Sequence, residues 1–148
     1  MKKTLLFLGA FLSIVLFGQG IITKNTPSKN GSAIPNYAVL KSKMNLDGVV
    51  TQADKAPEFP GGIDAFHRKF AENMDIIDVD SKKIDTRVYF IVEKNGYVRY
   101  VTATGDDKKH SAAAETAVRR MFVKWKPAMI NNEPVRYLYT FPLSLKKY

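Results

Sequence analysis

Two runs of strand-forming residues, RVYFIV and YVRYVTAT, flank Asn95-Gly96 and dominate the hydrophobic pattern of the chain. Because Asn-Gly tolerates the positive φ angles of a type I′ turn, the pattern predicts a β-hairpin over 87–104 with a two-residue loop. In that register the facing pairs are Val88 with Ala103, Phe90 with Val101 and Val92 with Arg99. One side of the hairpin is then apolar. The other side, which carries Tyr89, Ile91 and Tyr100, meets water or a partner.

A helix is predicted on each side of this hairpin in the sequence. The first follows the APEFPGG bend at 56–62, where Ile63, Phe66, Phe70 and Met74 recur at helical spacing. The second begins near Asp106-Asp107, with Ser111 as a candidate N-cap, and ends before Lys126-Pro127. Its apolar half consists of Ala113, Ala114, Ala117, Val118, Met121 and Phe122.

The last strand is predicted over 134–145, after a turn at Asn131-Asn132. Pro142 cannot donate to a β-ladder, so this strand belongs at a sheet edge. A right-handed crossover places it beside the first hairpin strand, which gives the order 2-1-3. The sequence therefore predicts an α+β fold with two helices on one face of a three-stranded antiparallel sheet. Val49-Val50-Thr51 is a candidate for a further short strand.

The length and composition of the 148-residue chain fit one globular domain with additional segments. It has no cysteine, which excludes disulfides, thiolate metal sites and lipid-modified cysteines. Of its two histidines, His67 is expected to be partly buried and His110 exposed. We find no motif for an enzyme, so we predict no catalytic, cofactor-binding or metal-binding residue. The acidic residues Asp75, Asp78, Asp80 and Asp85 lack the pattern of a calcium loop.

The N-terminus suggests export. Met1-Lys2-Lys3 precedes an apolar run, so residues 1–20 are predicted to be a signal peptide, with an uncleaved membrane anchor as the alternative. Residues 21–48 are predicted to be a flexible linker, and 49–148 the folded domain. The chain is therefore expected in the periplasm, either free or anchored to the inner membrane. The net charge of +9 is spread along the sequence, so no nucleic-acid partner is expected.

Four segments together resemble the TonB C-terminal domain family, in the form common among Bacteroidetes envelope proteins. They are APEFPGGIDAF at 56–66, KNGYVRYV at 94–101, KWKPA at 124–128 and NNEPVRYLYTFPLSL at 131–145. The chain departs from the family pattern at Val123, at Asn132 and at Asp75-Ile76-Ile77. The resemblance covers roughly 49–148 and implies the same α+β fold. It also implies a module that transmits force, or docks, by pairing with a segment of an outer-membrane transporter.

The expected function is therefore that of an exported partner-binding module. An extended peptide would add as a fourth strand to the exposed edge of the last strand. The predicted partner-binding residues are Val135, Arg136, Tyr137, Leu138, Tyr139 and Thr140. The alternatives are a structural envelope protein that contacts peptidoglycan and, as a further alternative, an enzyme without a recognisable motif. Trp125 is interpreted as a core residue, with a ligand-stacking role as its alternative. A monomer and a strand-swapped homodimer both stay open.

Overall fold

The structure is a computed structural model that describes residues 34–78 and 83–146. Its elements, in chain order, are α1 (Tyr37–Lys43), β1 (Val49–Val50), α2 (Gly62–Asn73), β2 (Lys83–Val92), β3 (Val98–Gly105), α3 (Lys108–Arg120), β4 (Ala128–Ile130) and β5 (Glu133–Lys146). The expected α+β class is confirmed. The described residues form three helices and a mixed sheet of five strands, so two helices on a three-stranded antiparallel sheet account for only part of the fold.

The sheet is organised around β2, which pairs antiparallel with β3 on one side and with β5 on the other. This confirms the 2-1-3 order expected for these three strands. The two further strands both pair with the first part of β5. β1 runs parallel to it, with Val49 opposite Arg136, and β4 runs antiparallel to it, with Ala128 opposite Val135.

The β2–β3 hairpin closes through a longer loop than expected. The Gly96 N–H donates to the Glu93 carbonyl at 2.8 Å, and the Glu93 N–H donates to the Tyr97 carbonyl at 2.9 Å. Of Asn95 and Gly96, only Gly96 has a positive φ, at 84°. This is a turn followed by a glycine bulge, and it places Val92 opposite Val98. The expected facing pair of Val92 and Arg99 is therefore wrong.

A bulge at Tyr100 returns the hairpin to the expected register. Tyr100 has a φ of 55°, and the pairing shifts by one residue between Tyr89 and Ile91. Beyond the bulge Val88 lies opposite Ala103, as predicted. The type I′ geometry occurs instead at Asn131-Asn132, where both residues have positive φ (51° and 62°) and join β4 to β5.

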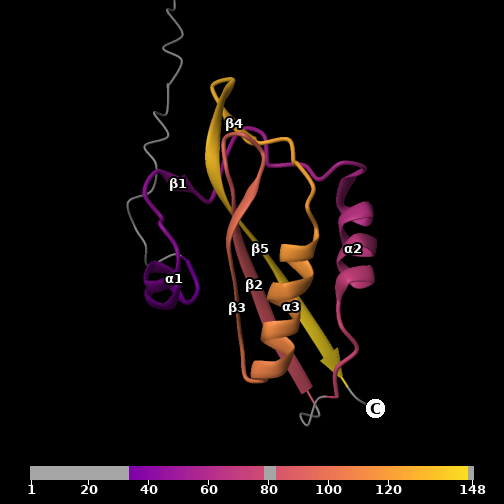
Figure 1. Cartoon of the computed structure of the whole chain (residues 1–148). Coiled ribbons are helices and arrows are strands. Elements are labelled where there is room, and N and C mark those ends of the chain that lie inside the picture. Colours follow the sequence, from indigo (N-terminus) through magenta and orange to yellow (C-terminus); the bar gives the residue numbers. More distant parts are fainter. Residues whose placement is uncertain (1–33, 79–82, 147–148) are drawn as a thin grey trace, which may run out of the picture.

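Helices α2 and α3 cover one face of the sheet, and the main core lies between them and the strands (Figure 1). Trp125 is 4% exposed and its ring centroid lies 5.2 Å from that of Phe59 and 5.1 Å from that of Tyr139. This confirms Trp125 as a core residue. Because α3 ends at Arg120, well before the predicted end, Phe122 is 94% exposed and does not join the apolar face of the helix.

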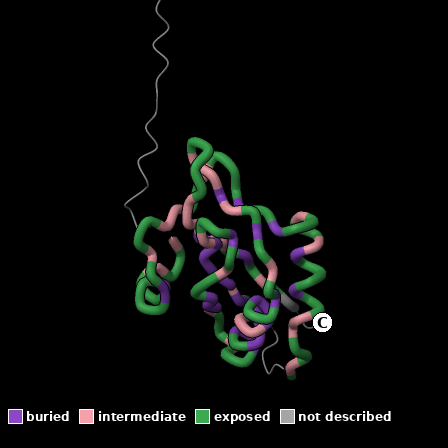
Figure 2. Tube along the Cα trace, turned by 45° about the horizontal axis from the view of Figure 1, so that its top comes forward, coloured by how far each residue is buried: buried purple, intermediate pink, exposed green. Residues whose placement is uncertain are grey.

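Helix α1 packs on the opposite face of the sheet and forms a second core there (Figure 1). Leu40 and Met44 cover Tyr89, Ile91 and Leu138, all of which are buried. The hairpin side expected to meet water or a partner is therefore largely internal. Figure 2 shows the buried stretches running through the middle of the molecule, while α1, at the left of the view, is mostly exposed.

The predicted linker is shorter than expected. Residues 34–48 belong to the fold and include α1, so the flexible-linker prediction is wrong for this part of 21–48. Residues 21–33, and the predicted signal peptide or anchor at 1–20, lie outside the described residues. Within the described ranges, no helix has the length and apolar character needed to cross a membrane.

Candidate functional site

The six predicted partner-binding residues all lie in β5, and they fall into two groups: those that pair with β1 or β4 and those that do not. Val135 already pairs with Ala128 of β4. Arg136 and Tyr137 lie opposite the two residues of β1. The chain itself therefore occupies the first part of the predicted site, and these three residues are not free to bind an added strand.

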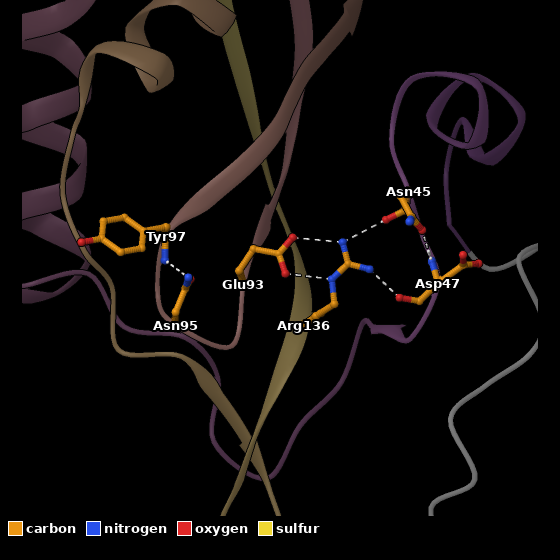
Figure 3. A network of polar contacts seen from close by, with 6 residues as sticks. All are labelled: Asn45, Asp47, Glu93, Asn95, Tyr97 and Arg136. Carbon is orange, nitrogen blue, oxygen red and sulfur yellow. Dashed lines mark hydrogen bonds and ion pairs between the residues drawn. The ribbon is translucent and has the colours of Figure 1, made fainter.

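Arg136 is also held by side-chain contacts (Figure 3). Its Nε donates to Glu93 Oε2 at 2.8 Å and its Nη2 to Glu93 Oε1 at 3.0 Å, a bidentate pair. The guanidinium also donates to the backbone carbonyls of Asn45 and Asp47. The two charged side chains are only 17% and 18% exposed, and the hydrogen bond with Glu93 raises the pKa of Arg136. Arg136 therefore ties β5 and the hairpin to the segment after α1.

Leu138 and Tyr139 anchor β5 from its two faces. Leu138 is 4% exposed in the second core, beneath α1. Tyr139 is half-buried in the main core, where its ring stacks on Phe90 with centroids 5.1 Å apart. Burial raises the pKa of the Tyr139 hydroxyl. Neither side chain is available for a partner without disturbing a core.

The part of β5 from Tyr139 to Lys146 lies beyond β1 and β4, and we call it the open edge. Among the described residues, this segment pairs with β2 and with no other strand. Pro142, which has no N–H, fits the ladder if its nitrogen faces away from β2. Backbone groups two residues apart point the same way, so the N–H groups of Thr140 and Ser144 face outward too.

Only Tyr139 and Thr140 of the open edge were among the predicted residues, and the Thr140 side chain is exposed. The pairing of the first part of β5 with β1 and β4 is not readable from the residues of β5, so the sequence alone does not distinguish residues 135–137 from the open edge. Pro142 was the signal that pointed to this half of the strand.

The opposite edge of the sheet, on β3, is closed by side chains from α3. The Ala103 N–H donates to Glu115 Oε1 at 2.8 Å, and Arg119 Nη2 donates to the Val101 carbonyl at 2.8 Å. Arg119 also bonds Glu115 Oε2 at 3.0 Å. Natural sheets protect their edges by such coverings, because unpaired strands associate with other chains. The two edges of this sheet therefore differ.

A cleft with a volume of about 640 Å³ lies between the C-terminal end of α2 and the open edge of β5. Its walls come from α2, from the segment after α2, and from β5. The lining residues are His67, Phe70, Ala71, Met74, Asp75, Ile76, Ile77, Ile84, His110, Phe141, Pro142, Leu143 and Ser144. The lining is therefore mostly apolar and contains both histidines of the chain.

The two histidines lie contrary to expectation. His67 is exposed, whereas His110 is 3% exposed and its Nδ1 lies 2.9 Å from Thr86 Oγ1. Asp107, rather than Ser111, caps α3, because its carboxylate accepts from the His110 N–H at 2.9 Å. Burial lowers the pKa of His110, and the nearby charge of Asp107 opposes this effect. The imidazole is therefore part of the interior.

The described residues hold no cluster of histidine and acidic side chains that could bind a metal ion. No protein-family model matches the chain, and no curated protein or solved structure is significantly similar to it. The family resemblance of residues 49–148 thus stays a hypothesis that depends on the four sequence segments.

Proposed function

We propose that this chain is an exported TonB-like binding module of the cell envelope, which docks an extended segment of an outer-membrane transporter by β-strand addition. The observation that carries the proposal is the difference between the two sheet edges. The open edge of β5 has no strand beyond it in the described part of the chain, whereas Glu115 and Arg119 occupy the edge of β3. In the described part of the chain, the open edge is therefore the longest stretch of strand that we expect an incoming strand to pair with.

The open edge suits backbone recognition. The outward N–H and C=O groups of an edge strand form hydrogen bonds with any extended peptide, and pockets for alternate side chains add specificity. Thr140, Pro142 and Ser144 are exposed, and the apolar cleft touches the strand from Phe141 to Ser144. The site is therefore shifted along β5 from the predicted 135–140 toward the C-terminal half of the strand.

Thr140 offers the cleanest test of this mechanism. Thr140→Pro removes an N–H that faces outward, whereas Thr140→Val keeps the backbone and the size of the side chain. Leu138 is unsuitable, because it is buried in the second core. The wild type and both variants are used to capture transporters from solubilised envelope. Peptides from the periplasm-facing segments of each captured transporter are then screened, and the one that binds the wild type is used for calorimetry.

We expect the peptide to bind the wild type and Thr140→Val alike, and to bind Thr140→Pro much more weakly, provided that circular dichroism shows both variants folded. Binding should also slow hydrogen exchange of the Thr140 and Ser144 amides. Equal weakening in both variants would indicate recognition through side chains instead. Co-sedimentation with peptidoglycan and no transporter capture would support the structural envelope protein.

A further inference from the structure

The cleft is continuous with the open edge. Four consecutive residues of β5, from Phe141 to Ser144, line it. Successive side chains of a strand point to opposite faces, so a cavity that touches all four must reach the strand backbone. A peptide paired with this part of β5 would therefore run along the mouth of the cleft.

The chemistry of the cleft favours an uncharged occupant. Its walls include Phe70, Ala71, Met74 and Leu143, and its one acidic residue, Asp75, is already bound to Arg120 at 2.6 Å. A volume of about 640 Å³ lies within the range of pockets that hold small ligands, so a large side chain fits.

We propose that the strand added to the open edge inserts an apolar side chain, aliphatic or aromatic, into this cleft. The inference rests on the proposed function, and it narrows the partner to extended peptides that carry such a residue opposite Phe141 to Leu143. On an added strand, side chains at alternate positions lie on the same face. One position, or two positions spaced by two residues, would therefore be selected for apolar character. The positions between them lie on the opposite face of the added strand.

A display library of random peptides of about nine residues tests this, since the true partner need not be known. Peptides are selected on the wild-type chain, and those that fail to bind Thr140→Pro are kept as edge binders. We expect the edge binders to share an apolar residue at one position. Replacing that residue by Glu in a synthetic peptide should weaken binding about tenfold or more.

Ala71 allows the complementary change in the protein. It is exposed on α2 and lines the cleft, so Ala71→Lys places a cation at the cleft without disturbing the core. Ala112, exposed on α3 and outside the cleft lining, gives the matched control Ala112→Lys. We expect Ala71→Lys to weaken the apolar peptide and to strengthen the Glu peptide relative to wild type. Ala112→Lys should change neither.

The outcomes separate the two proposals. Edge binders that show no apolar preference, or that respond alike to Ala71→Lys and Ala112→Lys, would overturn the cleft inference and leave strand addition intact. A library that yields no peptide sensitive to Thr140→Pro would overturn both. Apolar peptides that bind Thr140→Pro as well as wild type would also overturn the inference, because the cleft would then act without the edge.

Discussion

At the residue scale, the hairpin shows how a readable signal was missed. Val98, Val101 and Ala103 all face the main core. Their spacing is three residues and then two, whereas strict alternation would require two throughout. One residue must therefore be extra, and the structure shows that it is Tyr100. The Asn-Gly pair predicted the position of the turn correctly. The loop is longer than two residues, and Val98 rather than Arg99 therefore packs against the main core.

Gly96 is the position in this hairpin where we expect substitution to cost most. Its φ is 84°, and a Cβ there would lie 2.0 Å from the Trp125 carbonyl oxygen. Gly96→Ala therefore adds a steric clash to backbone strain, and we expect a loss of more than about 2 kcal/mol in the free energy of unfolding. Urea denaturation measures it.

Gly48 provides the control for this substitution. Its φ is 66°, and a Cβ there would meet nothing within 4 Å. Gly48→Ala should cost only the strain of the backbone, about 1 kcal/mol. Equal losses at the two positions would show that the approach of Trp125 to the turn does not matter for stability.

His110 predicts a pH dependence of stability. Its pKa is lowered in the folded chain from 6.5, so protonation favours unfolding. The free energy of unfolding should be highest above pH 6.5 and fall as the pH drops below that value toward the folded pKa. Denaturation of wild type and His110→Gln between about pH 8 and pH 5 measures the difference.

His110→Gln should flatten the pH dependence of the free energy of unfolding above the range in which carboxylates titrate. A variant that keeps the slope of the wild type would show that His110 does not cause it.

At the element scale, the sequence predicted β2, β3, β5 and α2 well because their apolar periodicity is strong. It missed α1 because that helix has seven residues and no side-chain cap, so it depends on packing against Tyr89 and Ile91 rather than on local signals. The covering of β5 by β1 and β4 was missed for the same reason, since strand pairing depends on residues far apart in the chain. The predicted site consequently includes Val135, Arg136 and Tyr137, which pair with β4 and β1.

The edge of β3 yields a prediction about association. Replacing Glu115 and Arg119 together with Ala would free the Ala103 N–H and the Val101 carbonyl. We expect the folded double variant to self-associate as its concentration rises, because an uncovered strand pairs with other chains. Sedimentation velocity measures this.

A second exposed ion pair serves as the matched control for that double variant. Lys69 and Glu72 on α2 are 3.4 Å apart, and neither side chain bonds a strand in the described contacts. Lys69→Ala with Glu72→Ala should therefore leave the association state of the chain unchanged. Association of this control to the same degree would attribute the effect to lost charge rather than to the edge.

At the scale of the whole molecule, the sheet is covered on both faces, so the segment before β1 is part of the folding unit. A chain that starts at Asp47 lacks Leu40 and Met44, and it exposes Tyr89 and Ile91. Each large apolar side chain contributes roughly 1.5–3 kcal/mol when buried, so we expect a loss of about 3 kcal/mol or more in unfolding free energy.

A chain that starts at Ile34 retains the second core and provides the comparison for this truncation. It should unfold at the same denaturant concentration as the full chain. Leu40→Ala in the full chain should cost about 2–5 kcal/mol, because it leaves a cavity beneath α1. If the Asp47 truncation and the Ile34 truncation were equally stable, α1 would be an addition to the fold rather than part of it.

The two residues of β1 also set a limit on length. Because β1 ends opposite Tyr137, a strand added to β5 meets the end of β1 and can extend only over Tyr139 to Lys146. At about 3.3 Å per residue this segment measures roughly 26 Å. Affinity should therefore rise as a bound peptide lengthens to roughly eight residues and then stop rising. The position of β1 would thus limit the length of the partner segment that contributes to binding.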